Sequence, residues 1–207
     1  MNSKMMASFL AAATLLASTP AFAADCAGLE GKDLEKCEKK NASAAKQDAR
    51  SVPFTPSQLD PALPAWDAPE KNPFATEAYR VRVTPTDLAS VDGYLAKAFK
   101  IQATVVFSRY LVDEAGKANM DAIKVIPKMV PILAAVATDG QALVTEGQAL
   151  VTSGVPNEVK ANPALAMKAP KILTGLKDGI TALQSALSEA PAVVTSLGDA
   201  AKNVAPM

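Results

Sequence analysis

Hydrophobic positions recur at steps of three, four and seven residues through most of the chain after residue 84. Such steps place apolar side chains along one face of an α-helix. The pattern is clearest over residues 88–112, 123–151 and 172–204, and no alternating pattern of comparable length is present. We therefore predict an all-α protein, with a helical bundle domain over residues 74–207.

Helix starts and breaks determine how many helices we expect. Thr84, Pro85 and Asp87 are suited to the N-cap, the first helical position and an acidic first turn, and Gly116 ends that helix. An interior proline removes a hydrogen bond and crowds the preceding turn. On this basis we expect a kink or a restart at Pro127 and Pro131, and breaks or restarts at Gly154, Pro156, Pro163, Pro170 and Pro191. They divide the pattern into a proline-interrupted bundle of four to five helices, with a short helical piece at residues 164–168.

The first 23 residues have the pattern of a secretory signal peptide. Lys4 precedes an apolar run over residues 5–17, and a breaker-rich stretch leads to the small-residue site Ala21-Phe22-Ala23. The alternative, an N-terminal membrane anchor, is disfavoured because the apolar run is shorter than the about 20 residues needed to span a bilayer. We expect a mature chain that begins at Ala24, is exported to the periplasm or the extracellular space, and has no transmembrane anchor.

Residues 24–50 contain the two cysteines of the chain, Cys26 and Cys37. In an oxidising compartment a disulfide is the expected state. On one continuous helix the two residues would lie about 16 Å apart along the axis, too far to bridge. We therefore predict a disulfide-closed hairpin, with a turn at residues 26–31 folded back on a helix over about residues 33–45. A redox-active pair is disfavoured because the spacing is not C-x-x-C.

Residues 51–73 form a proline-rich segment, which we call the strap. Prolines at this density exclude a regular helix and favour an extended chain. Phe54, Trp66 and Phe74 are expected to anchor the strap on the helical body, and the alternative is a free arm that docks on a partner. Residues 79–83 alternate polar and apolar side chains, but we identify no partner strand and expect an extended entry into the bundle.

A tandem heptad is the most specific local motif. The six residues 140–145, Gly-Gln-Ala-Leu-Val-Thr, recur at 147–152, so that Gly140, Gly147 and Gly154 follow one helical stripe. Gly175 and Gly179 form a similar notch on a later helix. Glycine inside a helix costs about 1 kcal/mol relative to alanine, which indicates a close approach at these positions. We favour packing of the two notched helices on each other; a seam for self-association and a groove for a lipid tail are the alternatives.

Composition limits the available chemistry. The chain has no histidine and equal numbers of basic and acidic residues, 21 of each. The chain therefore lacks the residue needed for histidine-dependent catalysis and for the usual zinc and haem ligand sets. It also lacks the excess of basic residues that is typical of nucleic-acid-binding proteins. The carboxylates are scattered, and Arg109 and Asp113 fit a local i,i+4 salt bridge. We predict no catalytic, cofactor or metal site.

These observations lead to a functional hypothesis. We expect an exported, non-enzymatic helical protein of the cell envelope or secreted space, acting as a structural or protein-interaction module. Its partner is another protein or a second copy of the chain. The alternative is a carrier for a lipid or other hydrophobic ligand, held between helices lined by alanine and valine.

Overall fold

The structure, a computed structural model, describes residues 30–50, 52–68 and 70–203. It is mostly helical, which confirms the all-α class. The α-helices of these residues are α1 (Gly31–Arg50), α2 (Ala89–Gly116), α3 (Met120–Ala149), α4 (Val155–Ala161) and α5 (Ala169–Asn203).

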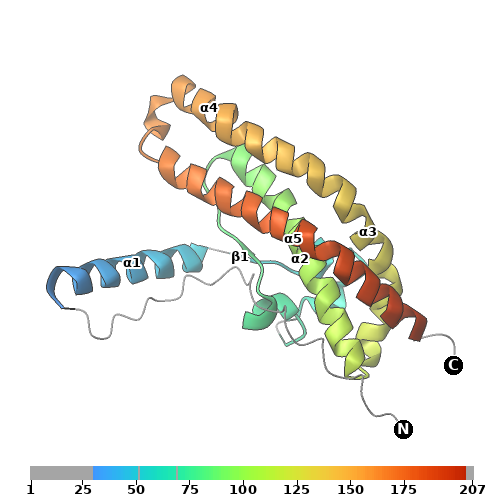
Figure 1. The fold of residues 1–207 in the computed structure, drawn as a ribbon. Helices are drawn as coiled ribbons and strands as arrows, with labels where there is room; N and C mark the ends of the chain where they lie inside the picture. Colours follow the sequence, from blue (N-terminus) through green and yellow to red (C-terminus); the bar gives the residue numbers. More distant parts are fainter. Residues whose placement is uncertain (1–29, 51, 69, 204–207) are drawn as a thin grey trace, which may run out of the picture.

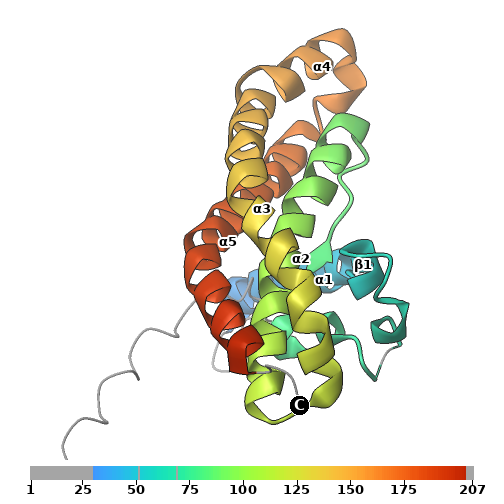
Figure 2. The same cartoon turned by 90° about the vertical axis from the view of Figure 1, so that its right-hand side faces the viewer.

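Three long helices, α2, α3 and α5, pack pairwise into a bundle, and α4 follows α3 at one end of it (Figure 1; Figure 2). The predicted restart at Pro191 is wrong, and Pro127 and Pro131, where we expected a kink or a restart, do not restart the helix, because α3 and α5 run through these residues. All three prolines are solvent-exposed. Each one removes a hydrogen bond on the outer side of its helix, while the apolar face on the inner side continues without a gap. The described part of the bundle domain has four α-helices, α2 to α5, within the predicted range of four to five, and α3 and α5 are longer than we expected.

Gly154 and Pro156 also fail to break the chain. A π-helical turn, Leu150–Gly154, joins α3 to α4, and the Val155 N–H donates to the carbonyl of Leu150 five residues back. A wider turn of this kind accommodates a residue that a regular helix would exclude. The break at Pro163 does occur, but the predicted helical piece at 164–168 is a 3-10 turn, Pro163–Leu165, and α5 begins beside Pro170 as predicted.

Helix α2 ends at Gly116, as predicted, but begins at Ala89 rather than near Thr84. Asp87 has a left-handed backbone with φ of 65°, which turns the chain just before the helix. The Asp92 carboxylate accepts hydrogen bonds of 2.7 Å from both the backbone N–H and the hydroxyl of Thr86. The acid of the first turn therefore holds Thr86 outside the helix, and the proline signal before it does not start the helix.

The strap folds more than its proline content predicted. It forms short 3-10 turns at Pro56–Gln58, Pro64–Trp66 and Pro73–Ala75, followed by a further turn at Glu77–Tyr79. The expectation that residues 79–83 lack a partner strand is wrong. Strand β1 (Val52–Pro53) pairs antiparallel with β2 (Arg82–Val83), and the pairing extends through the Phe54 N–H to the carbonyl of Val81 at 3.0 Å. The start of the strap is thereby held against the segment that leads into α2.

Helix α1 extends away from the bundle (Figure 1). It begins and ends beyond the predicted helix at about 33–45, and Cys37 is buried on it. The predicted signal peptide at 1–23, the turn at 26–31 for the most part, and Cys26 lie outside the described residues. The Cys26–Cys37 disulfide therefore stays a prediction.

The core is filled by large side chains from all three bundle helices and from the strap. Fully buried examples are Phe74, Tyr94, Phe107, Leu111, Ile126, Met129, Leu133, Ile172, Leu176, Leu183 and Leu197. Among the described helices, none is both long and apolar enough to cross a membrane.

Candidate interaction surface

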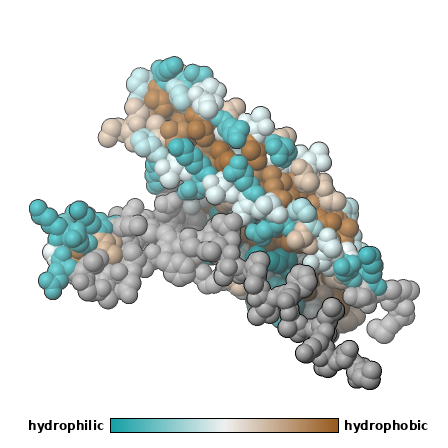
Figure 3. All heavy atoms as spheres, viewed as in Figure 1, coloured by the Kyte–Doolittle hydropathy of each residue, from teal (hydrophilic) through white to brown (hydrophobic). Residues whose placement is uncertain are grey.

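An apolar seam runs along the outside of the bundle between α3 and α5; we call it the outer seam. On α5 it consists of five partly buried residues at exact steps of seven: Leu173, Ile180, Leu187, Val194 and Ala201. Steps of seven keep side chains on one side of a helix. The facing flank of α3 carries Val130, Ala137 and Val144, and Val151 continues the steps of seven into the π-turn. Figure 3 shows the resulting hydrophobic band over these two helices.

The α3 side of the outer seam carries no charge from Pro131 to Ala149. Glu146 and Asp139 lie seven residues apart, on the opposite flank of the helix, and Glu146 pairs with Lys97 of α2 at 3.1 Å. The seam side instead presents glutamine and threonine, including Gln141 and Gln148 from the two heptad copies. A neutral, partly apolar strip of this kind fits a helix of another polypeptide without requiring opposite charge.

Large side chains occupy the glycine positions beneath the outer seam. A Cβ atom at Gly140 would overlap the end of the Leu187 side chain on α5. A Cβ at Gly147 would overlap the phenol of Tyr94 on α2, 2.6 Å from Cζ, and would lie 2.8 Å from Cγ1 of Ile180. These two glycines therefore form notches that receive Leu187 and Tyr94.

The other predicted glycines differ among themselves. Gly179 faces the end of Leu95 of α2, whereas Gly175 lies within ordinary contact distance of Thr86, and Gly154 faces Leu150 of its own turn. The two glycine-bearing helices, α3 and α5, are in contact along the bundle. At Gly140, Gly147 and Gly179 the notch accommodates a large side chain from a neighbouring helix, so these three glycines face the interior of the bundle.

The strap anchors lie against α2. The Trp66 ring meets Phe107 and Tyr110 edge-to-face, with centroids 5.9 and 6.0 Å apart, and Phe74 lies 6.1 Å from Phe107. Phe54 packs on Phe74 at 6.2 Å. All three anchors are buried. Their aromatic surface is therefore used within the chain and is not presented to a partner.

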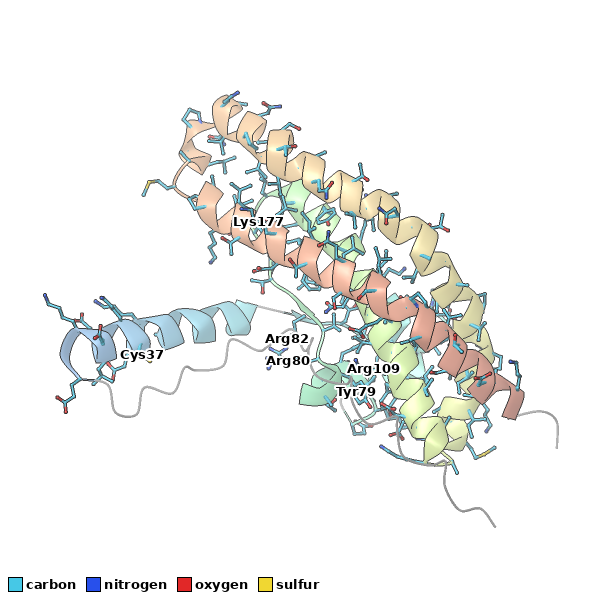
Figure 4. All side chains as sticks on the ribbon, in the orientation of Figure 1. Cys37, Tyr79, Arg80, Arg82, Arg109 and Lys177 are labelled. Carbon is cyan, nitrogen blue, oxygen red and sulfur yellow. The ribbon has the colours of Figure 1, made fainter. Side chains whose placement is uncertain are left out.

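A polar cluster ties the turn Glu77–Tyr79 and α5 to α2. Arg109 pairs with Glu189 of α5 at 3.4 Å, and its guanidinium carbon lies 5.8 Å from the centre of the Tyr79 ring (Figure 4). The Tyr79 hydroxyl donates to Asp113 at 2.5 Å. Instead of forming the predicted salt bridge with each other, Arg109 pairs with Glu189 and Asp113 accepts from Tyr79. The i,i+4 spacing indicates only partners on the same helix, so it could not predict Glu189.

Burial, followed by the hydrogen bond to Asp113, raises the pKa of Tyr79 to about 12. The phenol therefore stays protonated and keeps its role as donor at neutral pH. A shallow pocket beside Arg109 is lined by Gln102, Ser185 and Glu189, and the buried Oε1 of Gln102 has no hydrogen-bond partner among the described residues. Ser185 donates to Glu189 at 3.3 Å. Through these contacts the cluster joins α2, α5 and the turn that contains Tyr79.

Tyr94 is the residue that sequence reasoning missed. It is 1% exposed, and its hydroxyl, buried against the notch at Gly147, has no partner among the described residues. Burial, with a smaller contribution from the Glu146 carboxylate, raises its pKa to about 12. The signal in the sequence was the glycine itself, which indicates close approach without identifying the residue that approaches.

No family model, curated protein or solved structure matches this chain. Among the described residues, no three side chains of histidine, cysteine, aspartate and glutamate gather where they could hold a metal ion. The outer seam is therefore the feature from which a function is best argued.

Proposed function

We propose that this protein is an exported, non-enzymatic interaction module of the cell envelope or secreted space, and that its outer seam binds a helix of another polypeptide. The observation that carries the proposal is the heptad series of partly buried apolar residues on α5, faced by an uncharged flank of α3. Heptad-spaced apolar residues are the pattern that helices use to pack on one another.

Export is supported by the signal-peptide pattern of residues 1–23. The non-enzymatic part of the proposal is supported by the absence of histidine from the sequence and by the scatter of its carboxylates. The polar groups that do cluster, Arg109, Glu189, Tyr79 and Asp113, are engaged with one another.

The interior of the bundle favours an interaction module over a carrier of hydrophobic ligands. A carrier needs space between its helices, and the glycines at 140, 147, 154, 175 and 179 were one place where a groove for a lipid tail was considered. Leu187, Tyr94 and Leu95 fill the notches at 140, 147 and 179. The remaining apolar surface lies on the outside, where a partner helix rather than an enclosed ligand would cover it.

The test uses charge at two positions of the tandem heptad. Replacing Gln141 and Gln148 by arginine places two cations on the outer seam, whereas replacing Ala142 and Ala149 by arginine places them on the opposite exposed flank of the same helix. We expect the glutamine variant to lose association while the alanine variant retains it, because a buried interface does not accept an unpaired charge.

Association is measured by light scattering on the purified mature chain, and by cross-linking from a photoreactive residue at position 148 in intact cells. Self-association in the first measurement identifies a second copy as the partner, and a cross-link to a different protein identifies a hetero-partner. A monomeric protein that gives no cross-link at position 148, or a glutamine variant that associates like the parent, would contradict the proposal. Circular dichroism confirms that both variants are folded.

A further inference from the structure

The turn that joins α4 to α5, at the end of the bundle, combines exposed apolar side chains with lysine. Met167 on this turn is 93% exposed, and it is one of two large hydrophobic side chains with high exposure among the described residues. Pro163, Ala164 and Ala166 beside it are also exposed. Because an isolated methionine on a surface needs no explanation, the charges around it decide the interpretation.

Lysine is the only charged residue type between residues 159 and 177. Lys160, Lys168 and Lys171 surround the turn, all exposed, and Lys177 follows farther along α5 (Figure 4). The nearest acids along the chain are Glu158, whose carboxylate accepts a hydrogen bond from Ser90 of α2 at 2.5 Å, and Asp178. The turn is thus locally cationic in a chain whose formal net charge is zero.

We propose that the α4–α5 turn docks the protein on an anionic lipid surface, with Met167 inserted among the headgroups and Lys160, Lys168 and Lys171 facing lipid phosphates. Lysine near an anionic membrane contributes attraction that falls off within a Debye length, and burial of an apolar side chain adds a contribution that salt does not screen. Methionine is unbranched and flexible, which suits insertion into a disordered interface.

The same charges would attract other polyanions, and the apolar tip favours lipid. The turn has no aromatic residue on which a base could stack, in contrast to single-stranded nucleic-acid sites. An acidic peptide would use the lysines but would gain nothing from a fully exposed methionine. Because the turn lies at the end of the bundle and the outer seam runs along its side, docking through the turn leaves the outer seam open.

The experiment measures co-sedimentation of the purified protein with vesicles of phosphatidylcholine alone and of phosphatidylcholine with one third phosphatidylglycerol. We expect binding to the anionic vesicles only. Replacing Lys160, Lys168 and Lys171 together by glutamine is expected to weaken it about 100-fold. The matched control replaces Lys32, Lys36 and Lys39 of α1, which removes the same charge from another exposed helix and is expected to leave binding nearly unchanged.

Met167→Ser tests insertion, and Met120→Ser is its control because Met120, 51% exposed, lies at the start of α3 and away from this turn. We expect the Met167 variant to bind about 10-fold more weakly and the Met120 variant to bind like the parent. Equal loss in both lysine variants would overturn the site. Binding to soluble polyglutamate or heparin that exceeds binding to the anionic vesicles would replace the lipid by an acidic polymer and overturn the proposal. The lysines and Met167 lie outside the outer seam, so the outcome of these vesicle experiments does not decide whether the seam binds a partner helix.

Discussion

The two copies of the heptad have the same six residues and different structures. Residues 140–145 lie in the regular part of α3, and Gly140 faces the flexible end of Leu187. Residues 147–152 run into the π-turn Leu150–Gly154, and Gly147 faces the rigid ring of Tyr94. Identical local sequence therefore does not produce an identical local environment. The neighbouring helices and the residues that follow each copy determine the difference.

We attribute the π-turn to Pro156, which lies four residues after the second threonine. A regular helix would require an N–H at position 156 for the carbonyl of Thr152, and the proline ring would crowd that carbonyl. The Val155 N–H instead reaches the carbonyl of Leu150. Hydroxyls of Thr152 and Ser153 donate to the carbonyls of Gln148 and Ala149 at 3.0 and 2.9 Å, which adds partners around the widened turn.

Leucine at the two equivalent glycines gives the largest expected difference between the copies. Gly147→Leu must displace an aromatic ring, and we expect it to destabilise the fold by about 3 kcal/mol. Gly140→Leu meets the end of a leucine side chain, and we expect a cost of about 1 to 2 kcal/mol. Urea unfolding followed by circular dichroism measures both. Two variants as stable as the parent would show that neither glycine is an internal notch.

Alanine at the same positions sharpens the comparison. It gains about 1 kcal/mol of helix propensity at either site. Whether the substitution stabilises or destabilises the fold therefore depends on the space for one methyl group. At Gly140, rotation of Leu187 can make that space, and we expect a change near zero. At Gly147 the Tyr94 ring cannot rotate away, and we expect a net loss of about 1 kcal/mol. The ring leaves no space for the added methyl group. A stabilised Gly147→Ala variant would show that the ring can move.

Periodicity was sufficient to predict the helical class and the inner faces, because residues such as Leu95, Leu176 and Leu183 keep one phase over many turns. Proline was over-weighted. Pro127, Pro131 and Pro191 satisfy the local rule for a break, but continuous burial on the opposite face outweighs the loss of one hydrogen bond each. A rule based on the proline alone does not include the burial of the opposite helix face, so it could not predict that the helix continues.

Contacts between distant segments were the other limit. The pairing of Val52–Pro53 with Arg82–Val83 joins a segment with no strand signal to one whose alternating pattern gave no indication of its partner. The outer seam was visible only as part of the apolar pattern, since periodicity gives the direction of Ile180 and Leu187 but not how much of each the neighbouring helix covers. The pairing of Arg109 with Glu189 likewise depends on how α5 lies on α2.

Tyr94→Phe tests the second notch without changing its shape. The hydroxyl is buried without a hydrogen-bond partner among the described residues, so its removal relieves a desolvation cost. We expect phenylalanine to raise the free energy of unfolding by about 1 kcal/mol at pH 7. Tyr79→Phe is the matched control, because that hydroxyl donates to Asp113 and its loss is expected to destabilise. A destabilised Tyr94→Phe variant would indicate that the hydroxyl has a partner.

The pKa of Tyr94 predicts a pH dependence confined to the alkaline range. The folded state holds this proton with a pKa of about 12, whereas the unfolded state releases it with the model value of 10.0. Ionisation therefore favours the unfolded state first, and stability falls as the pH rises from 10 towards 12. Urea unfolding at pH 9 and pH 11 measures this loss of stability. Between these two pH values we expect the free energy of unfolding to fall by about 1 kcal/mol less in Tyr94→Phe than in the parent. Identical slopes for parent and variant would contradict the raised pKa.

The smallest expected difference concerns the two threonines at the ends of the heptad copies. Thr152 donates to the carbonyl of Gln148 at 3.0 Å beside the π-turn, whereas the equivalent contact of Thr145 is 3.4 Å long in the regular helix. Valine has the same branching at Cβ, so the exchange mainly removes the hydroxyl. We expect Thr152→Val to cost about 0.5 kcal/mol and to speed amide exchange across residues 150–154, with little change for Thr145→Val. Equal effects in both copies would mean that the π-turn is held by the Leu150–Val155 hydrogen bond and by burial of Val155, without help from the hydroxyl.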